Sequence, residues 1–166
     1  TISISNNNLN VNFDSTSDIQ INDGNDGIAM AGETIGLSIP LINHGSQTAT
    51  NITATLTSTS DKVTVDQGTI SYSSISSGET IYSNDFIISI LPSAKQYEDL
   101  ELRLAITNDN LNQWDSEIPI DVMGSLLTVI STGYFQPGET TSLDITLSNT
   151  GMLTASGITG ELQYNG

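Results

Sequence analysis

The sequence has no cysteine among its 166 residues. This excludes disulfide bonds, thiolate metal sites and a cysteine nucleophile within the chain. Histidine is nearly absent too, and the single His44 cannot form a zinc site without further histidine or cysteine ligands. No apolar run approaches the roughly 20 residues of a membrane-spanning helix, so we expect no membrane insertion.

Basic residues are also scarce. Lys62, Lys95 and Arg103 stand against 19 acidic residues, which gives a formal net charge of −16 at pH 7. Binding to nucleic acid needs clustered lysine and arginine, so we expect no nucleic-acid partner. Abundant Ser, Thr and Asn with little Lys is typical of large bacterial surface proteins. We therefore expect an extracellular or cell-surface location, and, since the chain opens on Thr1, a piece of a longer polypeptide.

What the sequence does have is a period-2 alternation of apolar and polar residues, which predicts β-strands. Strands are predicted at 33–43, 51–56, 62–66, 69–75, 85–90, 99–106 and 117–122. Pro40 cannot donate to a β-ladder, so the first of these is predicted to be an edge strand or to carry a bulge. No stretch has a helical period. Short strands separated by polar turns predict an all-β, antiparallel, immunoglobulin-like β-sandwich.

A repeat divides the chain. The segments GETIGLSIPLINHGSQTATNITATL (32–56) and GETTSLDITLSNTGMLTASGITGEL (138–162) are identical at 13 of 25 positions without a gap. We predict lead-in strands or the tail of a preceding module in 1–18, a complete sandwich in 19–124, and the first strands of a second, truncated repeat in 125–166. The truncated repeat cannot bury its apolar face alone. We expect it to pack on the first module, borrow N-terminal strands, or pair with another molecule.

The acidic loop NDGNDGIAMAGE (22–33) is a candidate calcium site. Counted from Asn22, Asp26 is fifth, Gly27 sixth and Glu33 twelfth, which are decisive positions of an EF-hand-type calcium loop. The candidate ligands are Asn22, Asp23, Asp26 and Glu33, and a bound calcium would be structural. The alternative is an acidic turn, because the second repeat keeps Glu139 without the acidic residues before it.

Two further features have competing interpretations. In the segment 108–117, Trp114 could stack on a sugar beside amide and acidic side chains, or it could close the edge of the core in a hairpin loop. His44 lies in a predicted turn, and its counterpart in the second repeat is Thr150. No nucleophile motif or phosphate loop is present, so we expect no catalytic activity.

The repeated segment resembles the CARDB-like, immunoglobulin-like modules of bacterial secreted surface proteins, including the accessory domains of gingipain-type peptidases. The likeness lies in the Gly-Glu before a strand, the Asn-x-Gly turn at Asn43 to Gly45, and the Ala49, Asn51 and Ile52 pattern that follows. It implies a non-catalytic spacer or adhesion module whose partners are neighbouring domains of the same polypeptide. Host proteins, matrix proteins and glycans are possible further partners, and a carbohydrate- or matrix-binding module is the alternative.

Overall fold

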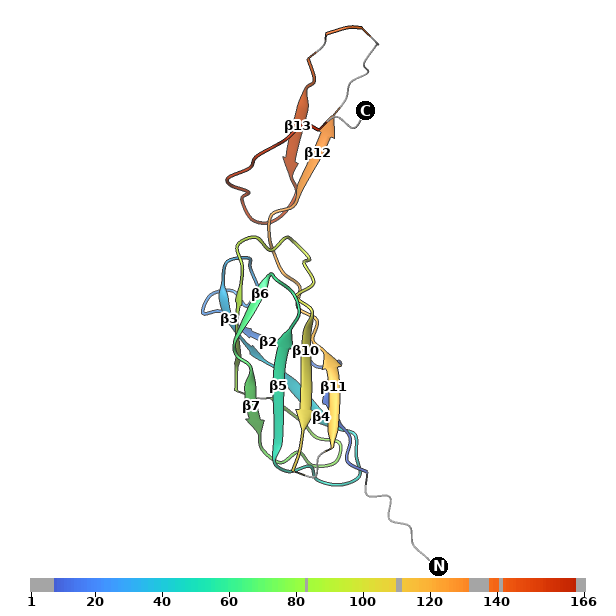
Figure 1. Cartoon of the computed structure of the whole chain (residues 1–166). Helices are drawn as coiled ribbons and strands as arrows, with labels where there is room; N and C mark the ends of the chain where they lie inside the picture. Colours follow the sequence, from blue (N-terminus) through green and yellow to red (C-terminus); the bar gives the residue numbers. More distant parts are fainter. Residues whose placement is uncertain (1–7, 83, 110–111, 132–137, 141, 164–166) are drawn as a thin grey trace, which may run out of the picture.

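The computed structural model describes residues 8–82, 84–109, 112–131, 138–140 and 142–163, and it is all-β (Figure 1). Part of the predicted lead-in (1–7) and part of the predicted second repeat (132–137, 141 and 164–166) lie outside these residues. Every strand pairing is antiparallel, as the sequence predicts. Within the described residues, no helix is long and apolar enough to cross a membrane.

Two layers of strands form a β-sandwich. One layer has the order β2-β3-β9-β6 and continues into a second group, β1-β4-β8. The facing layer has the order β11-β10-β5-β7. The strands of the first layer are β1 (Val11–Phe13), β2 (Gln20–Asn22), β3 (Thr34–Ser38), β4 (Pro40–Asn43), β6 (Val63–Gln67), β8 (Thr80–Tyr82) and β9 (Phe86–Ile90). Those of the second are β5 (Ile52–Ser58), β7 (Thr69–Tyr72), β10 (Leu102–Thr107) and β11 (Gln113–Glu117).

The strand that contains Pro40 lies in the middle of its layer, so the edge-strand interpretation was wrong. β3 is flanked by β2 and β9, and β4 is flanked by β1 and β8. Pro40 is the first residue of β4, directly after a break at Ile39, and a missing N–H is tolerated at the start of a strand. The Pro40 carbonyl still accepts a bond from the Asp14 amide at 3.0 Å.

The core consists of the apolar positions that the alternation places inward. Those in β3, β4 and β9 belong to one buried cluster with those of β5 and β10 in the facing layer, as in aligned sandwich layers. The largest of the fully buried side chains are Phe86, Ile35, Leu37, Ile39, Leu41, Ile52, Leu56, Ile75, Ile88, Leu100, Leu104 and Ile106. No buried side-chain nitrogen or oxygen in the described part of the chain lacks a hydrogen-bond partner.

Two local predictions in the second layer were wrong. Gln113–Glu117 was predicted as part of a loop but forms β11, and Trp114 lies opposite Ile106 of β10. The segment 117–122 was predicted as a strand, but beyond Glu117 it is irregular. Pro119 interrupts the ladder there, although Ile118 and Val122 remain buried.

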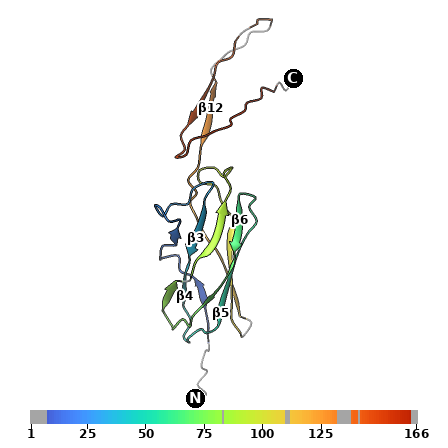
Figure 2. The same ribbon diagram turned by 90° about the vertical axis from the view of Figure 1, so that its left-hand side faces the viewer.

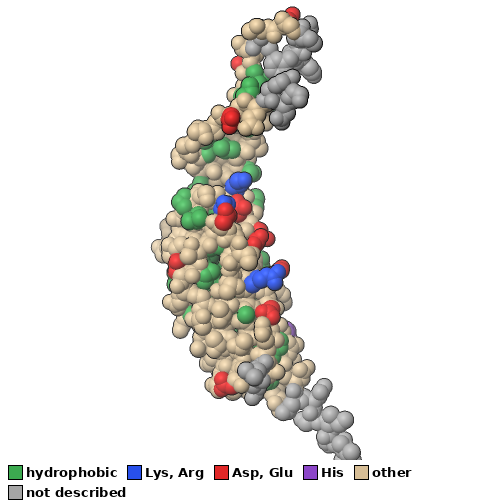
Figure 3. Space-filling view, in the orientation of Figure 1, with side chains coloured by type: hydrophobic (Ala, Val, Ile, Leu, Met, Phe, Trp, Pro, Cys, Tyr) green, Lys and Arg blue, Asp and Glu red, His purple; other side chains and the backbone are tan. Residues whose placement is uncertain are grey.

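Beyond the sandwich, a hairpin of β12 (Leu127–Ser131) and β13 (Ile145–Asn149) continues the long axis of the molecule (Figures 1 and 2). Few contacts join the hairpin to the sandwich. Lys95 and Ser125 form an isolated parallel β-bridge through their backbones, and the Met152 amide donates to the Gln96 side chain at 2.8 Å. Within the described residues, the hairpin forms a two-stranded sheet that no other strand joins. Apolar side chains are visible on its surface (Figure 3).

Candidate functional site

The two Asn-x-Gly turns make the same hydrogen bonds. At the first, the Gly45 amide donates to Asn43 Oδ1 at 2.9 Å, and Asn43 Nδ2 donates to the carbonyl four residues on at 2.7 Å. At the second, the Gly151 amide donates to Asn149 Oδ1 at 3.0 Å, and Asn149 Nδ2 donates to the carbonyl four residues on at 2.8 Å. The turns therefore share these two hydrogen bonds as well as their asparagine and glycine.

The strands that lead into these turns correspond as well. Asn43 lies opposite Val11 in the β1–β4 pair, and Asn149 lies opposite Leu127 in the β12–β13 pair. The residue after each asparagine donates to its partner strand in the same way: His44 to the Asn10 carbonyl at 2.8 Å, and Thr150 to the Leu126 carbonyl at 2.9 Å. By strand register, β12 and β13 stand where β1 and β4 stand in the sandwich.

The two hairpins differ in what covers them. Leu41 of β4 is fully buried beneath the facing layer, whereas its counterpart Leu147 of β13 is 49% exposed. Leu127 and Val129 of β12 are exposed too. The described residues 150–163 contain no strand. The inward face of the second hairpin therefore lacks the facing layer that buries the same positions in the first.

The acidic loop is organised by Asp23. Its carboxylate accepts backbone bonds from Asn25 at 2.9 Å, Gly27 at 3.2 Å and Asp26 at 3.3 Å. These amides, that of Asn25 foremost, lower the pKa of Asp23 to about 2, because they stabilise its ionised form. Gly24 and Gly27 take positive φ angles of 79° and 74°, which glycine adopts without strain. The loop is a tight turn closed by a carboxylate.

The other candidate calcium ligands face different partners. Asn22 donates to the Asp85 carboxylate at 2.8 Å, Asp26 accepts from the Ile28 amide at 3.0 Å, and Glu33 accepts from the Met30 amide at 3.1 Å. Among the described residues, no three Asp, Glu, His or Cys side chains come together as a metal-binding group. The Asp23 carboxylate is already bonded to amides of its own loop, and Glu33 is bonded to the Met30 amide, so calcium binding by this loop stays a prediction.

Asp14 forms a buried polar cluster that the sequence analysis missed. It is 4% exposed and accepts bonds from the Thr16 hydroxyl at 2.6 Å, the Ser17 hydroxyl at 2.8 Å and the Thr80 hydroxyl at 2.8 Å. These bonds, led by that from Thr16, hold the pKa of Asp14 well below its usual range despite burial. The cluster ties the β1–β2 connection to β8. The Asp-Ser-Thr-Ser run at 14–17 is a turn-forming pattern that could have indicated it.

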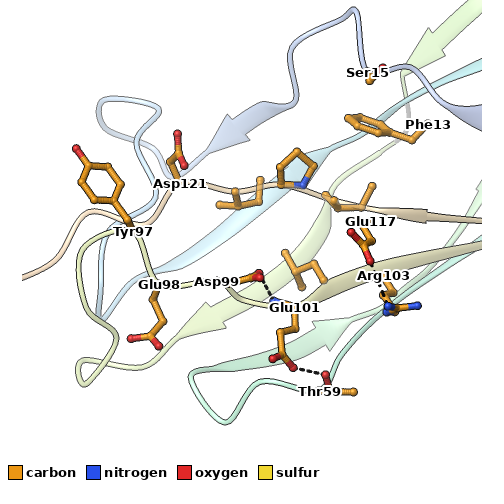
Figure 4. Close-up of a pocket in the computed structure, with 14 residues that line it drawn as sticks. Phe13, Ser15, Thr59, Tyr97, Glu98, Asp99, Glu101, Arg103, Glu117 and Asp121 are labelled. Carbon is orange, nitrogen blue, oxygen red and sulfur yellow. Dashed lines mark hydrogen bonds and ion pairs between the residues drawn. The ribbon is translucent and has the colours of Figure 1, made fainter.

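A groove of about 850 Å³ lies next to the Arg103–Glu117 end of the β10–β11 pair, where the two chain segments are no longer paired as strands (Figure 4). The Ile118 amide still donates to the Leu102 carbonyl at 2.9 Å, and the Tyr97 amide donates to the Val122 carbonyl at 2.8 Å. Between these bonds, the groove is lined by Glu98, Asp99 and Glu101 on one side and by residues 119–121 on the other.

Charge and an exposed ring characterise this groove. The Tyr97 side chain is 65% exposed beside Glu98 and Asp121 at one end, and the Arg103–Glu117 ion pair of 3.2 Å lies toward the other (Figure 4). Tyr97 has a positive φ of 60°, a left-handed backbone conformation that is uncommon for residues other than glycine. Carboxylates predominate over the single guanidinium, so the groove suits a neutral or cationic ligand.

The remaining candidates from the sequence lie apart from this groove. Trp114 is half-buried in β11 and packs against the core, and it is not among the residues that line the groove. His44 is exposed in the first Asn-x-Gly turn. A scan against models of known protein families finds no match, and a search of curated proteins finds no significant similarity.

Proposed function

We propose that this chain is a non-catalytic structural and adhesion module of a large extracellular bacterial protein, in which similar β-sandwiches follow one another end to end. The observation that carries the proposal is the correspondence of the β1–β4 and β12–β13 hairpins in register and turn hydrogen bonds. The resemblance to CARDB-like modules, drawn from the repeated segment, supports it.

The position of the second hairpin suits a serial arrangement. The first Asn-x-Gly turn lies at one end of the sandwich, near the start of the described chain, and β12 leaves from the opposite end (Figure 1). Modules joined in this way extend along one axis. The net charge of −16 favours separation of neighbouring molecules and solubility at the cell surface.

Neighbouring modules would meet through a small polar junction. Here it consists of the Lys95–Ser125 bridge, the bond from Met152 to Gln96, and the Leu153 amide donating to the Gly124 carbonyl at 3.1 Å. The chain passes from one unit to the next without a long flexible linker, because Gly124 belongs to the junction and Leu127 already begins β12. We therefore expect the spacing of the modules to be fixed rather than variable.

A completed two-module chain tests the proposal. The repeat alignment allows residues 57–124 to be placed directly after Leu162, which supplies the missing strands of the second unit. Small-angle X-ray scattering should then give a rod whose maximum dimension exceeds that of a single sandwich by about one further module. A compact particle with two modules side by side, or a second unit that stays unfolded, would contradict the end-to-end arrangement.

The groove supports a second candidate function, the binding of a glycan or a matrix protein. Its supporting observation is the exposed Tyr97 ring, which lies among hydrogen-bonding carboxylates as sugar-stacking rings do. A glycan array probed with the chain and with Tyr97→Ala tests it, with Trp114→Phe as a matched control away from the groove. Binding that depends on Tyr97 and not on Trp114 would favour glycan binding, and an array without signal would dismiss it.

A further inference from the structure

The outer edge of β13 carries no partner strand in the part of the chain that the structure describes. β12 pairs with one side of β13, and within the described residues no strand pairs with the other. The Thr150 amide donates to the Leu126 carbonyl, so the backbone N–H and C=O groups of the alternate residues Ser148 and Thr146 also point toward β12. Because antiparallel ladders alternate, the backbone N–H and C=O groups of Leu147 and Asn149 point away from β12 toward this open edge.

The first hairpin shows what occupies the equivalent edge. There, β8 pairs with β4, with Leu41 opposite Ile81 and Ile42 opposite Thr80. Just before β8, the Asn43 amide donates to the Glu79 carbonyl at 3.1 Å, and the Gly78 amide donates to the Asn43 carbonyl at 2.7 Å. Residues 75–82 thus form a strand and a preceding turn that satisfy the edge of β4.

The Asn43 side chain also bonds to the segment that covers the edge of β4. Asn43 Nδ2 donates to the Ile75 carbonyl at 3.0 Å in addition to its bond within the turn, and the Ser77 hydroxyl donates to the Gly45 carbonyl at 2.6 Å. Asn149 Nδ2 is exposed and makes the bond within its turn, to the Leu153 carbonyl. By the equivalence of the two turns, a bond from Asn149 Nδ2 to a carbonyl equivalent to that of Ile75 would complete the pattern seen at Asn43.

We propose that the outer edge of β13, from Thr146 to the Gly151 turn, is a strand-acceptor site for an extended polypeptide segment with the chemistry of residues 75–82. The segment adds antiparallel to β13, with an apolar residue opposite Leu147, a hydroxyl residue opposite Ser148, and a glycine whose amide donates to the Asn149 carbonyl. This inference rests on the equivalence of the two hairpins that also supports the proposed function.

A second copy of this chain does not suit the site. Its own residues 75–82 already pair with β4 inside the sandwich, so they are not available to another molecule. Association of two chains would also bring together two net charges of −16. The occupant is therefore a segment of this type that is not engaged in the first module.

A tethered copy of the segment provides the test. A copy of residues 73–82 (SSISSGETIY) is appended after Gly166 through a flexible Gly/Ser linker of about 12 residues, which spans roughly 20 Å and gives a millimolar effective concentration. Hydrogen exchange of the Leu147 and Asn149 amides, followed by NMR, should slow by about tenfold or more relative to the chain without the copy.

Two matched variants control the register. Gly78→Pro in the appended copy removes the amide that should donate to Asn149, and it should abolish the slowing. Leu147→Pro in β13 removes an outward N–H without removing a bond to β12, and it should abolish the slowing at the Asn149 amide. Unchanged protection of the Ser148 and Thr150 amides, which face β12, would verify that the hairpin remains folded.

Three results would overturn the inference: no slowing at Leu147 and Asn149, equal slowing with the Gly78→Pro copy, or concentration-dependent slowing in the chain without any copy. The last result would identify a second molecule of this chain as the occupant. The scattering experiment separates the two proposals. If the two-module chain is extended while the tethered copy gives no protection, the serial arrangement stands and the strand-acceptor site fails. If the tethered copy protects the edge while the two-module chain stays compact, the reverse holds.

Discussion

Replacement of Asn43 with alanine should destabilise the sandwich strongly, because the side chain is fully buried and makes three hydrogen bonds. Each such bond contributes about 1 kcal/mol net, and buried partners left without a bond add to the cost. The Gln47 and Ile75 carbonyls and the Gly45 amide would lose this partner. We expect a loss of about 3–4 kcal/mol in the free energy of unfolding.

Trp114 makes this loss measurable, because it is the single tryptophan and lies half-buried in the first module. Urea unfolding followed by its fluorescence should show a midpoint lower by about 2 M, for a denaturant dependence of about 1.5 kcal/mol per M. The matched control is Asn149→Ala, whose side chain is exposed, and it should change the Trp114 transition by less than about 0.5 kcal/mol. Equal effects of the two substitutions, or a loss below about 1 kcal/mol for Asn43→Ala, would refute this reasoning.

Three further predictions concern acid, packing and calcium. The pKa of Asp14 is lowered in the folded state, so its contribution to stability is present above its unfolded value of about 3.9 and is lost as the pH falls below that value; Asp14→Asn should flatten the acid side of a stability–pH profile, and an unchanged profile would contradict this assignment. A Cβ on Gly45 would clash with the Asn8 carbonyl and lie 2.9 Å from Asn43 Oδ1, so Gly45→Ala should lower the free energy of unfolding by at least about 2 kcal/mol. Gly160→Ala, where a Cβ would lie in open space, should have little effect, and equal free energies of unfolding for the two variants would argue against the close approach. If the acidic loop binds calcium, millimolar calcium should raise Tm by several degrees over EDTA, and Glu33→Gln should remove the increase; superimposable melting curves would identify the loop as a turn alone.

Alternation predicted the core because burial in a sandwich repeats every second residue. Leu104 and Phe86 occupy alternating apolar positions of the predicted strands 99–106 and 85–90, and both are fully buried. The position of a strand within its sheet was harder to predict, because a proline is compatible with an edge strand, a bulge or the start of a strand. Pro40 indicated an edge strand or a bulge, but β3 and β4 are both central in their sheets, and Pro40 is accommodated because the strand is interrupted at Ile39 and resumes with Pro40 as its first residue. Pro119 received no such weight, yet it ends the ladder beyond β11.

The groove and the Asp14 cluster lay beyond sequence analysis for a different reason. Both depend on distant segments that come together only in the fold: Asp14 accepts a bond from Thr80 of β8, and Glu98, Asp99 and Glu101 line the groove together with residues 119–121. Nothing local to either segment encodes the other. Tyr97 also has a left-handed backbone conformation, which no local pattern indicated. The repeat was accessible from sequence because it compares the chain with itself.

Calorimetry of the completed two-module chain tests the central claim most directly, that β12 and β13 begin a second module of the same kind. The chain of 166 residues should unfold with an enthalpy of roughly 70–80 kcal/mol near 60 °C, the value for one domain of the size of the first module. Once residues 57–124 follow Leu162, the total enthalpy should approximately double. An enthalpy that stays at the value for one module would show that the hairpin cannot organise the added strands, and it would contradict the account.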